Sequence, residues 1–217
     1  MKNVHEEIIS KYYGCGSPFP EALDGTTILD LGCGTGRDVY VVAQLVGPKG
    51  KAIGLDMTPE QLEVANWHLD WHSEKFGYSN VKFKQGFIEN LLEAGIEDNS
   101  IDIVISNCVL NLSPNKPEVF KEIFRVLKPG GELYFSDVYS DKLIPQEFRD
   151  DKTLWGECIS GALFYHEFEE LVHEIGFSQI RWISSTPIDL SDNPELCSKI
   201  DNIKFASITT WLFKIRN

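Results

Sequence analysis

The sequence lacks the cysteine patterns of disulfide-rich and zinc-binding proteins. It has five cysteines among 217 residues, they are widely spaced, and no two of them form a CxxC pair. Disulfide-rich secreted domains carry a dense, even set of cysteines, and structural zinc sites carry closely spaced pairs. We therefore expect no structural metal, and we expect free thiols at Cys15, Cys33, Cys108, Cys158 and Cys197.

Basic residues are also scarce. The chain has 20 Lys and Arg against 33 Asp and Glu, so its formal net charge is −13 at pH 7. Binding to a phosphate backbone relies on clustered Lys and Arg, so nucleic acid is not an expected partner. A membrane span needs a run of about 18 apolar residues, which is missing. The start, MKNVHEEIIS, also lacks the basic and apolar regions of a secretory signal, so we expect a cytoplasmic protein outside the membrane.

What the sequence does contain is a regular alternation of strands and helices. Amphipathic segments at 37–46, 58–75 and 117–127 separate short apolar runs at 26–31, 51–56, 80–86, 101–107 and 131–138. This alternation is typical of a parallel sheet with helices on both faces. After residue 138 a helix at 166–175 precedes two alternating runs, at 177–184 and 205–215.

These patterns predict an α/β fold with a mostly parallel, seven-stranded sheet that ends in an antiparallel hairpin. The length suits one core. We expect residues 1–138 to form an N-terminal segment plus a ligand-binding core. Residues 139–217 would form a substrate-binding excursion and the final strands of the same domain.

Three glycines follow the first strand in LDLGCGTGRD, at Gly32, Gly34 and Gly36. Such a strand-to-helix turn lets the backbone approach a ligand closely. The dinucleotide fingerprint would need glycine at position 37, where the chain has Arg37. Asp56 ends the second strand about 20 residues later, where a carboxylate can accept hydrogen bonds from a ribose. Packing alone could also explain the turn, and Asp56 could instead cap the next helix.

The motifs ILDLGCGTG, SNCVLNL and VFKEIFRVLKPGGELYFSD, together with Asp56, resemble class I S-adenosylmethionine-dependent methyltransferases over about residues 26–138. The resemblance implies a Rossmann-like fold and S-adenosylmethionine as cofactor. Tyr12 and Tyr13 could also close over the sulfonium, although packing explains them equally well. The cofactor-binding residues it implies are Tyr13, Gly32, Gly34, Gly36, Asp56, Met57, Gly86, Phe87, Ile88 and Asn107.

A narrower resemblance covers almost the whole chain. The segments NVHEEIISKYYGCG, SNCVLNL, LWGECISGAL and FASITTWLFK are similar to arsenite S-adenosylmethionine methyltransferases. The resemblance implies that thiolates of Cys15 and Cys158 bind trivalent arsenic as substrate, which fits the preference of soft centres for sulfur. The family's third cysteine position holds Ile203, and Cys197 lies six residues upstream. Cys33 and Cys108 are interpreted as small buried hydrophobes.

The predicted function is transfer of a methyl group to thiol-bound arsenite or methylarsenite, with a thiol reductant as partner. Two alternatives stay open. One is a class I methyltransferase for a small organic thiol, phenol or amine. The other is a non-catalytic protein that binds the cofactor or arsenic. His68 and His72, four residues apart, are expected on a partly solvated helix face rather than at a metal.

Overall fold

We describe the chain from a computed structural model, which places residues 3–12, 14, 16, 18–149, 154, 158–189 and 203–215. Three residues singled out in the sequence lie outside these ranges: Tyr13, Cys15 and Cys197. Within the described residues, no helix combines the length and the apolar character that crossing a membrane requires.

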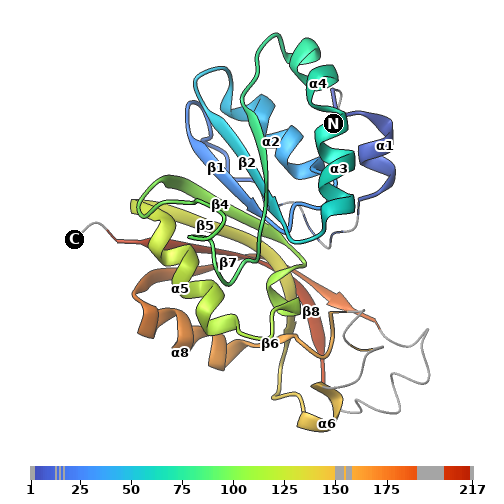
Figure 1. The fold of residues 1–217 in the computed structure, drawn as a ribbon. Coiled ribbons are helices and arrows are strands. Elements are labelled where there is room, and N and C mark those ends of the chain that lie inside the picture. The colour runs from blue at the N-terminus through green and yellow to red at the C-terminus, as the bar shows by residue number, and fades with distance from the viewer. Residues whose placement is uncertain are drawn as a thin grey trace.

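A single twisted sheet runs through the molecule (Figure 1). Its main path has the strand order β3-β2-β1-β4-β5-β8-β7, and β6 pairs with β5 beside this path. Strands β1 to β5 are parallel, while β8 runs antiparallel to both β5 and β7. The strands are β1 (Thr27–Leu31), β2 (Lys51–Asp56), β3 (Val81–Gln85), β4 (Ile101–Asn107), β5 (Leu127–Ser140), β6 (Leu163–Phe164), β7 (Phe177–Ile188) and β8 (Phe205–Lys214).

Helices cover both faces of this sheet. In Figure 1 the helices α2, α3 and α4 lie on one side, and α5 and α8 lie on the other. The helices are α1 (Glu6–Ser10), α2 (Arg37–Val46), α3 (Pro59–Trp67), α4 (Leu69–Phe76), α5 (Lys116–Val126), α6 (Gln146–Arg149) and α8 (Tyr165–Ile175), with a 3₁₀ turn η1 (Leu110–Leu112). The α/β fold with a mostly parallel sheet and an antiparallel end is therefore confirmed, and the two-residue strand β6 is an addition.

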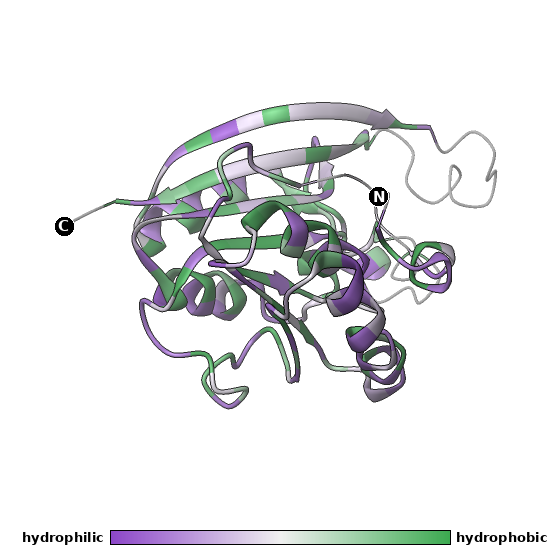
Figure 2. Ribbon diagram, turned by 90° about the horizontal axis from the view of Figure 1, so that it is seen from above, coloured by the Kyte–Doolittle hydropathy of each residue, from purple (hydrophilic) through white to green (hydrophobic). Residues whose placement is uncertain are grey.

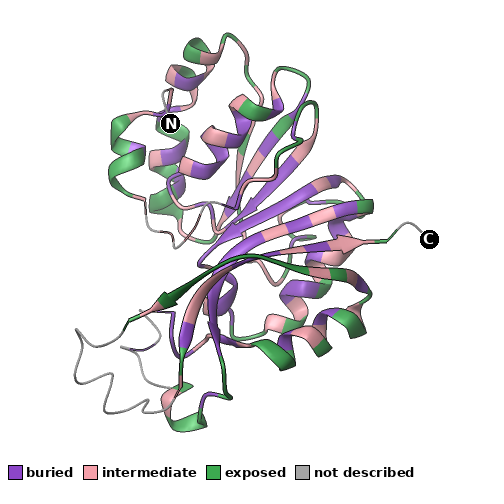
Figure 3. Cartoon of the chain, turned by 180° about the vertical axis from the view of Figure 1, so that it is seen from behind, coloured by how far each residue is buried: buried purple, intermediate pink, exposed green. Residues whose placement is uncertain are grey.

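The two faces hold separate apolar cores. Apolar residues alternate with polar ones along the helices, so that their hydrophobic sides face the strands (Figure 2). The core under α5 and α8 includes Val119, Phe120, Ile123, Phe168 and Val172, and the core under α2 includes Val39, Val42, Ala43 and Val46. The central strands are buried, whereas β7 at the sheet edge is exposed along most of its length (Figure 3).

The segment predicted as one helix over 58–75 is two helices, α3 and α4, which meet at His68. His68 and His72 are only 5% and 1% exposed, so the prediction of a solvated helix face is wrong. The reason is a tertiary contact with the N-terminal helix. The backbone N–H of His5 donates to Nε2 of His72 at 3.2 Å, and His68 Nε2 lies 2.9 Å from the Glu7 carboxylate.

Candidate functional site

A polar cavity lies at the carboxyl ends of β1 and β4, where the strand order of the parallel sheet reverses. Open α/β sheets bind ligands at such a switch point. Its lining comes from the glycine turn, from the loop after α1 and from the end of β4, and includes Tyr12, Asp30, Gly32, Gly34, Asp38 and Asn107.

The glycine turn takes a shape that other residues would resist. Gly32 has φ +68°, and a Cβ atom there would lie 2.4 Å from Val109 Cγ1. Gly36, with φ +87°, is the N-cap of α2. The backbone N–H of Gly34 donates to Asp56 Oδ2 at 2.8 Å, and Asp56 Oδ1 accepts from the N–H of Thr58 at 2.9 Å. Asp56 therefore fixes the turn to the end of β2 and also serves the start of α3.

Negative charge gathers around this cavity. Asp30 and Asp38 are buried, and burial raises the pKa of both carboxyls. The nearby carboxylates of Asp38 and Asp56 raise the pKa of Asp30 further. Arg37 offsets part of this charge, because its Nη1 lies 2.7 Å from Asp38 Oδ1. The cavity is thus suited to a ligand that carries positive charge.

Asn107, at the end of β4, connects the cavity to the N-terminal segment. Its Nδ2 donates to the Tyr12 hydroxyl at 2.6 Å and to the Gly16 carbonyl at 2.8 Å, and its Oδ1 accepts from the Gly16 N–H at 3.1 Å. The Arg37 guanidinium lies over the Tyr12 ring, 3.8 Å from its centroid. Tyr12 is therefore the aromatic residue that the described structure places at the cavity.

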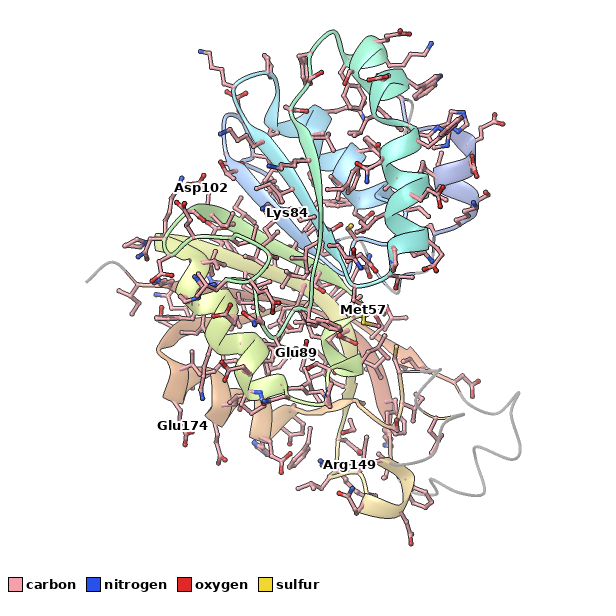
Figure 4. All side chains as sticks on the ribbon, viewed as in Figure 1. Met57, Lys84, Glu89, Asp102, Arg149 and Glu174 are labelled. Carbon is pink, nitrogen blue, oxygen red and sulfur yellow. The ribbon has the colours of Figure 1, made fainter. Side chains whose placement is uncertain are left out.

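Four further predicted residues lie at the ends of β2 and β3, outside the cavity lining. Met57 and Phe87 are 62% and 61% exposed, which is unusual for side chains of their size. Gly86 donates its N–H to the carbonyl of Asp56 at 3.0 Å, and Ile88 packs against the main core. Figure 4 shows Met57 at this edge of the sheet, above Glu89.

Two cysteines meet directly beyond Asn107. Cys108 and Cys158 are 7% and 5% exposed, and the Cys158 Sγ lies 3.8 Å from the carbonyl oxygen of Cys108. Both have φ +58°, a left-handed conformation that is uncommon for residues other than glycine. Both cysteines belong to one apolar cluster, and Ile203 packs against this cluster. The other buried members of the cluster are Val138, Ile144, Leu154, Ile159 and Phe205.

Comparison with known proteins identifies the family. A methyltransferase domain family matches residues 22–182. A solved structure described as an arsenic(III) S-adenosylmethionine methyltransferase from Chlamydomonas reinhardtii superimposes with a TM-score of 0.94 at 48% identity, covering 99% of this chain and 72% of that one. The chain belongs to the arsenite methyltransferase family.

Curated relatives agree with this assignment. The arsenite methyltransferases of Aquipseudomonas alcaligenes and Homo sapiens are 50% and 52% identical to this chain over 99% of its length. The chain spans 62% and 57% of the length of these two relatives.

Because the chain belongs to this family, it matters which of its cysteines are thiols and which are disulfide-bonded. Cys33 and Cys158 are thiols, and burial raises the pKa of Cys33 well above its usual value. Cys108 is disulfide-bonded, so the prediction that it is a free thiol is wrong. Its interpretation as a small packing residue also missed its position beside Cys158. The signal that could have found it is its place directly after Asn107 at the carboxyl end of β4.

Sequence reasoning also missed Asp137, at the carboxyl end of β5. It is fully buried, and burial raises its pKa to about 7. Its carboxylate accepts from the N–H of Asn111 at 3.1 Å and from the N–H of Val138 at 2.9 Å. Because η1 contains Asn111 and follows Cys108 closely, Asp137 positions the loop that carries this cysteine.

Proposed function

We propose that this chain transfers a methyl group from S-adenosylmethionine to trivalent arsenic bound by cysteine sulfur, as arsenite or methylarsenite. The observation that supports this most is the place of the buried Cys158 thiol, whose Sγ lies 3.8 Å from the Cys108 carbonyl oxygen, directly beyond Asn107 in the lining of the polar cavity. Thiolates are the protein ligands that select soft centres such as trivalent arsenic. The acceptor would thus lie next to the donor.

The residues of the cavity suit the cofactor. Gly32 and Gly34 in the lining, with Gly36 at the N-cap of α2, would allow its methionine part to approach the backbone, and the carboxyl groups of Asp30 and Asp38 would attract its positive charges. When bound, S-adenosylmethionine supplies an electrophilic methyl group on a sulfonium.

At the neighbouring strand ends Asp56 would accept from the ribose hydroxyls. The exposed Met57 and Phe87 would flank the adenine, near Gly86 and Ile88. Tyr13, which lies outside the described residues, is proposed to close over the same ligand.

At the cysteines, each thiol that displaces a hydroxyl from arsenite forms an arsenic–sulfur bond and releases one water. The arsenic lone pair stays available as the nucleophile, and the apolar cluster around Cys158 excludes water from the reaction. Cys108 must first be a thiol. Two molecules of a thiol reductant are oxidised to one disulfide as they reduce it, which is why we propose such a reductant as a partner. Cys15 is proposed as a further ligand.

A reducing compartment such as the cytoplasm suits a site that depends on thiolates. We propose in addition that residues 139–217 complete the same domain as residues 1–138. The pairing of β8 with β5 across nine residue positions joins the two segments in one sheet and supports a single domain.

Labelled methyl transfer tests the proposal. The purified chain is mixed with arsenite, methyl-labelled S-adenosylmethionine and a thiol reductant, and the arsenicals are separated by chromatography. Labelled methylarsenicals are expected. In Cys158→Ser the rate should fall by about 100-fold or more. The matched control Ile159→Val changes the same apolar cluster without removing sulfur, and should stay within about threefold of the parent.

Two results would contradict the proposal. The first is the absence of label on both arsenite and methylarsenite. The second is transfer to an organic thiol, phenol or amine that Cys158→Ser leaves intact, because such acceptors need no soft ligand. Cofactor binding without any transfer would instead support a non-catalytic binding protein.

A further inference from the structure

A second cavity, of about 510 Å³, opens beside the apolar cluster that contains Cys108 and Cys158, which we call the cysteine cluster; Ala162 packs against the cluster and lines the cavity. It lies between the first turns of α5 and α8 and the short helix α6. Lys116, Arg149 and Ser160 line it, together with Ser113 and Glu167. Figure 4 shows Arg149 on α6, well away from Met57 and the strand ends proposed for the adenine. The cavity is therefore separate from the proposed cofactor site.

Two cations line this cavity without a carboxylate partner. Lys116 Nζ donates to the Ser113 carbonyl at 3.3 Å, and Arg149 Nε donates to the Ile144 carbonyl at 3.1 Å. Among the described residues, no ion pair involves either cation, and Glu167 in the lining pairs with neither. Burial lowers the pKa of the Lys116 amine, and the buried Asp137 acts on this amine only at longer range, where it opposes that shift. In a chain with a net charge of −13, two cations that form no ion pair in one hollow favour an anionic ligand.

A buried hydroxyl in the lining points to the same kind of ligand. Ser160 is 3% exposed, and its Oγ has no hydrogen-bond partner among the described residues. Leaving a buried polar group without a partner is costly, so an acceptor from a ligand would remove this cost. The first turns of two eleven-residue helices, α5 and α8, also reach the cavity and add positive potential.

The cavity lies within a small molecule's length of the cysteines. Ser160 follows Cys158 by two residues, so their α-carbons are at most about 7 Å apart. The next residue, Gly161, packs directly on η1, because a Cβ atom there would lie 2.1 Å from the carbonyl oxygen of Asn111. A ligand held by Lys116 and Arg149 could therefore extend a second group toward the Cys158 sulfur.

We propose that this cavity binds the carboxylate end of an acidic thiol that carries trivalent arsenic to Cys158. This inference rests on the proposed function. In the exchange, the Cys158 sulfur forms a bond to arsenic, the bond between arsenic and the carrier sulfur breaks, and the Cys158 proton passes to the carrier thiol. No electron is gained or lost, so the step needs no oxidant or reductant.

Binding is measured first by calorimetry, without arsenic or S-adenosylmethionine. The probes are mercaptosuccinate, succinate and inorganic phosphate, added separately to the whole chain. Mercaptosuccinate and succinate should bind, and Lys116→Gln, Arg149→Gln and Ser160→Ala should each weaken them, by about tenfold for the two charge variants. Lys121→Gln is the matched control, since Lys121 is exposed on the same helix and pairs with Glu118, and binding should not change.

Methyl transfer is measured next, with arsenite premixed with mercaptosuccinate or with neutral 2-mercaptoethanol. The two charge variants should raise KM for the mercaptosuccinate complex by about tenfold and leave KM for the mercaptoethanol complex unchanged. Equal KM changes for both complexes would overturn the proposal.

Two other binding results would also overturn it. In one, phosphate binds more tightly than succinate and does not compete with mercaptosuccinate, which would indicate a site for a free oxyanion. In the other, all three variants bind the probes as the parent does. If the probes bind as expected and no thiol complex supports methyl transfer, the proposed function fails while the anion site stands.

Discussion

The polar cavity at the glycine turn and the cysteine cluster around Cys158 lie next to each other, because Asn107 lines the cavity and Cys108 follows it directly, yet they are built differently. The cavity takes its shape from backbone at the ends of parallel strands, with Gly34 hydrogen-bonded to Asp56. The cysteine cluster is apolar and draws on segments about 50 residues apart, as the contact between Cys108 and Cys158 shows. The family resemblance indicates a shared donor for the first region, whereas we propose that the second region binds the acceptor.

The largest expected effect is on the rate of methyl transfer when Cys108 is replaced, and it distinguishes the two regions. Cys108→Ser should lower methyl transfer to arsenite by about 100-fold or more, because it removes a sulfur that we propose as an arsenic ligand, while the Kd for S-adenosylmethionine stays within about twofold. Calorimetry for the cofactor and a labelled-methyl assay measure the two quantities. Equal losses of cofactor affinity and activity would mean that the two regions are not separable.

Gly32 tests where the two regions touch. Gly32→Ala should lower the free energy of unfolding by about 2–3 kcal/mol, because the new Cβ meets the Val109 side chain and the residue is held at φ +68°. Gly77→Ala is the control for backbone conformation alone. Gly77 has φ +78° with no atom within 4 Å of the new Cβ, so its cost should be about 1 kcal/mol.

A double variant completes this test in urea denaturation. Val109→Ala in the Gly32→Ala background should recover part of the loss, because it removes the atoms that the new Cβ meets. No recovery would show that packing between the glycine turn and the loop after β4 contributes nothing to the cost.

Asp56 tests the cavity side alone. Asp56→Asn should raise the Kd for S-adenosylmethionine by about tenfold to thirtyfold. The carboxylate accepts a backbone N–H on each oxygen, from Gly34 and from Thr58, whereas the neutral amide has one acceptor oxygen and can keep only one of these hydrogen bonds. Arsenite should slow the modification of the cysteines by a thiol reagent to the same extent in this variant as in the parent. A parallel loss of arsenite protection would show that the turn also organises the cysteine cluster.

The smallest effect concerns His72, which holds the N-terminal helix leading to Tyr12 and the cavity. Burial lowers the pKa of His72 to about 4, below its unfolded value of 6.5, so the native state favours the neutral ring. The stability this gives is present above pH 6.5 and is lost as the pH falls toward 4. Between pH 7 and pH 5 the parent should lose about 1–2 kcal/mol relative to His72→Gln.

Thermal and urea unfolding at several pH values measure this difference. A gap between parent and His72→Gln that stays constant from pH 7 to pH 5 would show that His72 carries no linked proton. His166 on α8 is 60% exposed at its side chain, so His166→Gln serves as a control for replacing a histidine.

The strand ends were predictable because their information is local. Glycines at positions 32, 34 and 36 after an apolar run, followed by Asp56, encode a turn whose geometry depends on few distant contacts. Cys108 was not predictable in the same way. In the sequence, a lone cysteine after a strand cannot be distinguished from a small packing residue, and only the fold brings Cys158 next to it. The break between α3 and α4 likewise depends on a tertiary contact, in which His68 and His72 bond to α1.

One peptide bond joins Asn107 to Cys108, so their α-carbons stay about 3.8 Å apart in every conformation of the chain. Asn107 lines the polar cavity, the proposed donor side, and Cys108 belongs to the apolar cluster, the proposed acceptor side. A shift of β4 would carry both sides together and preserve the alignment that an in-line displacement needs.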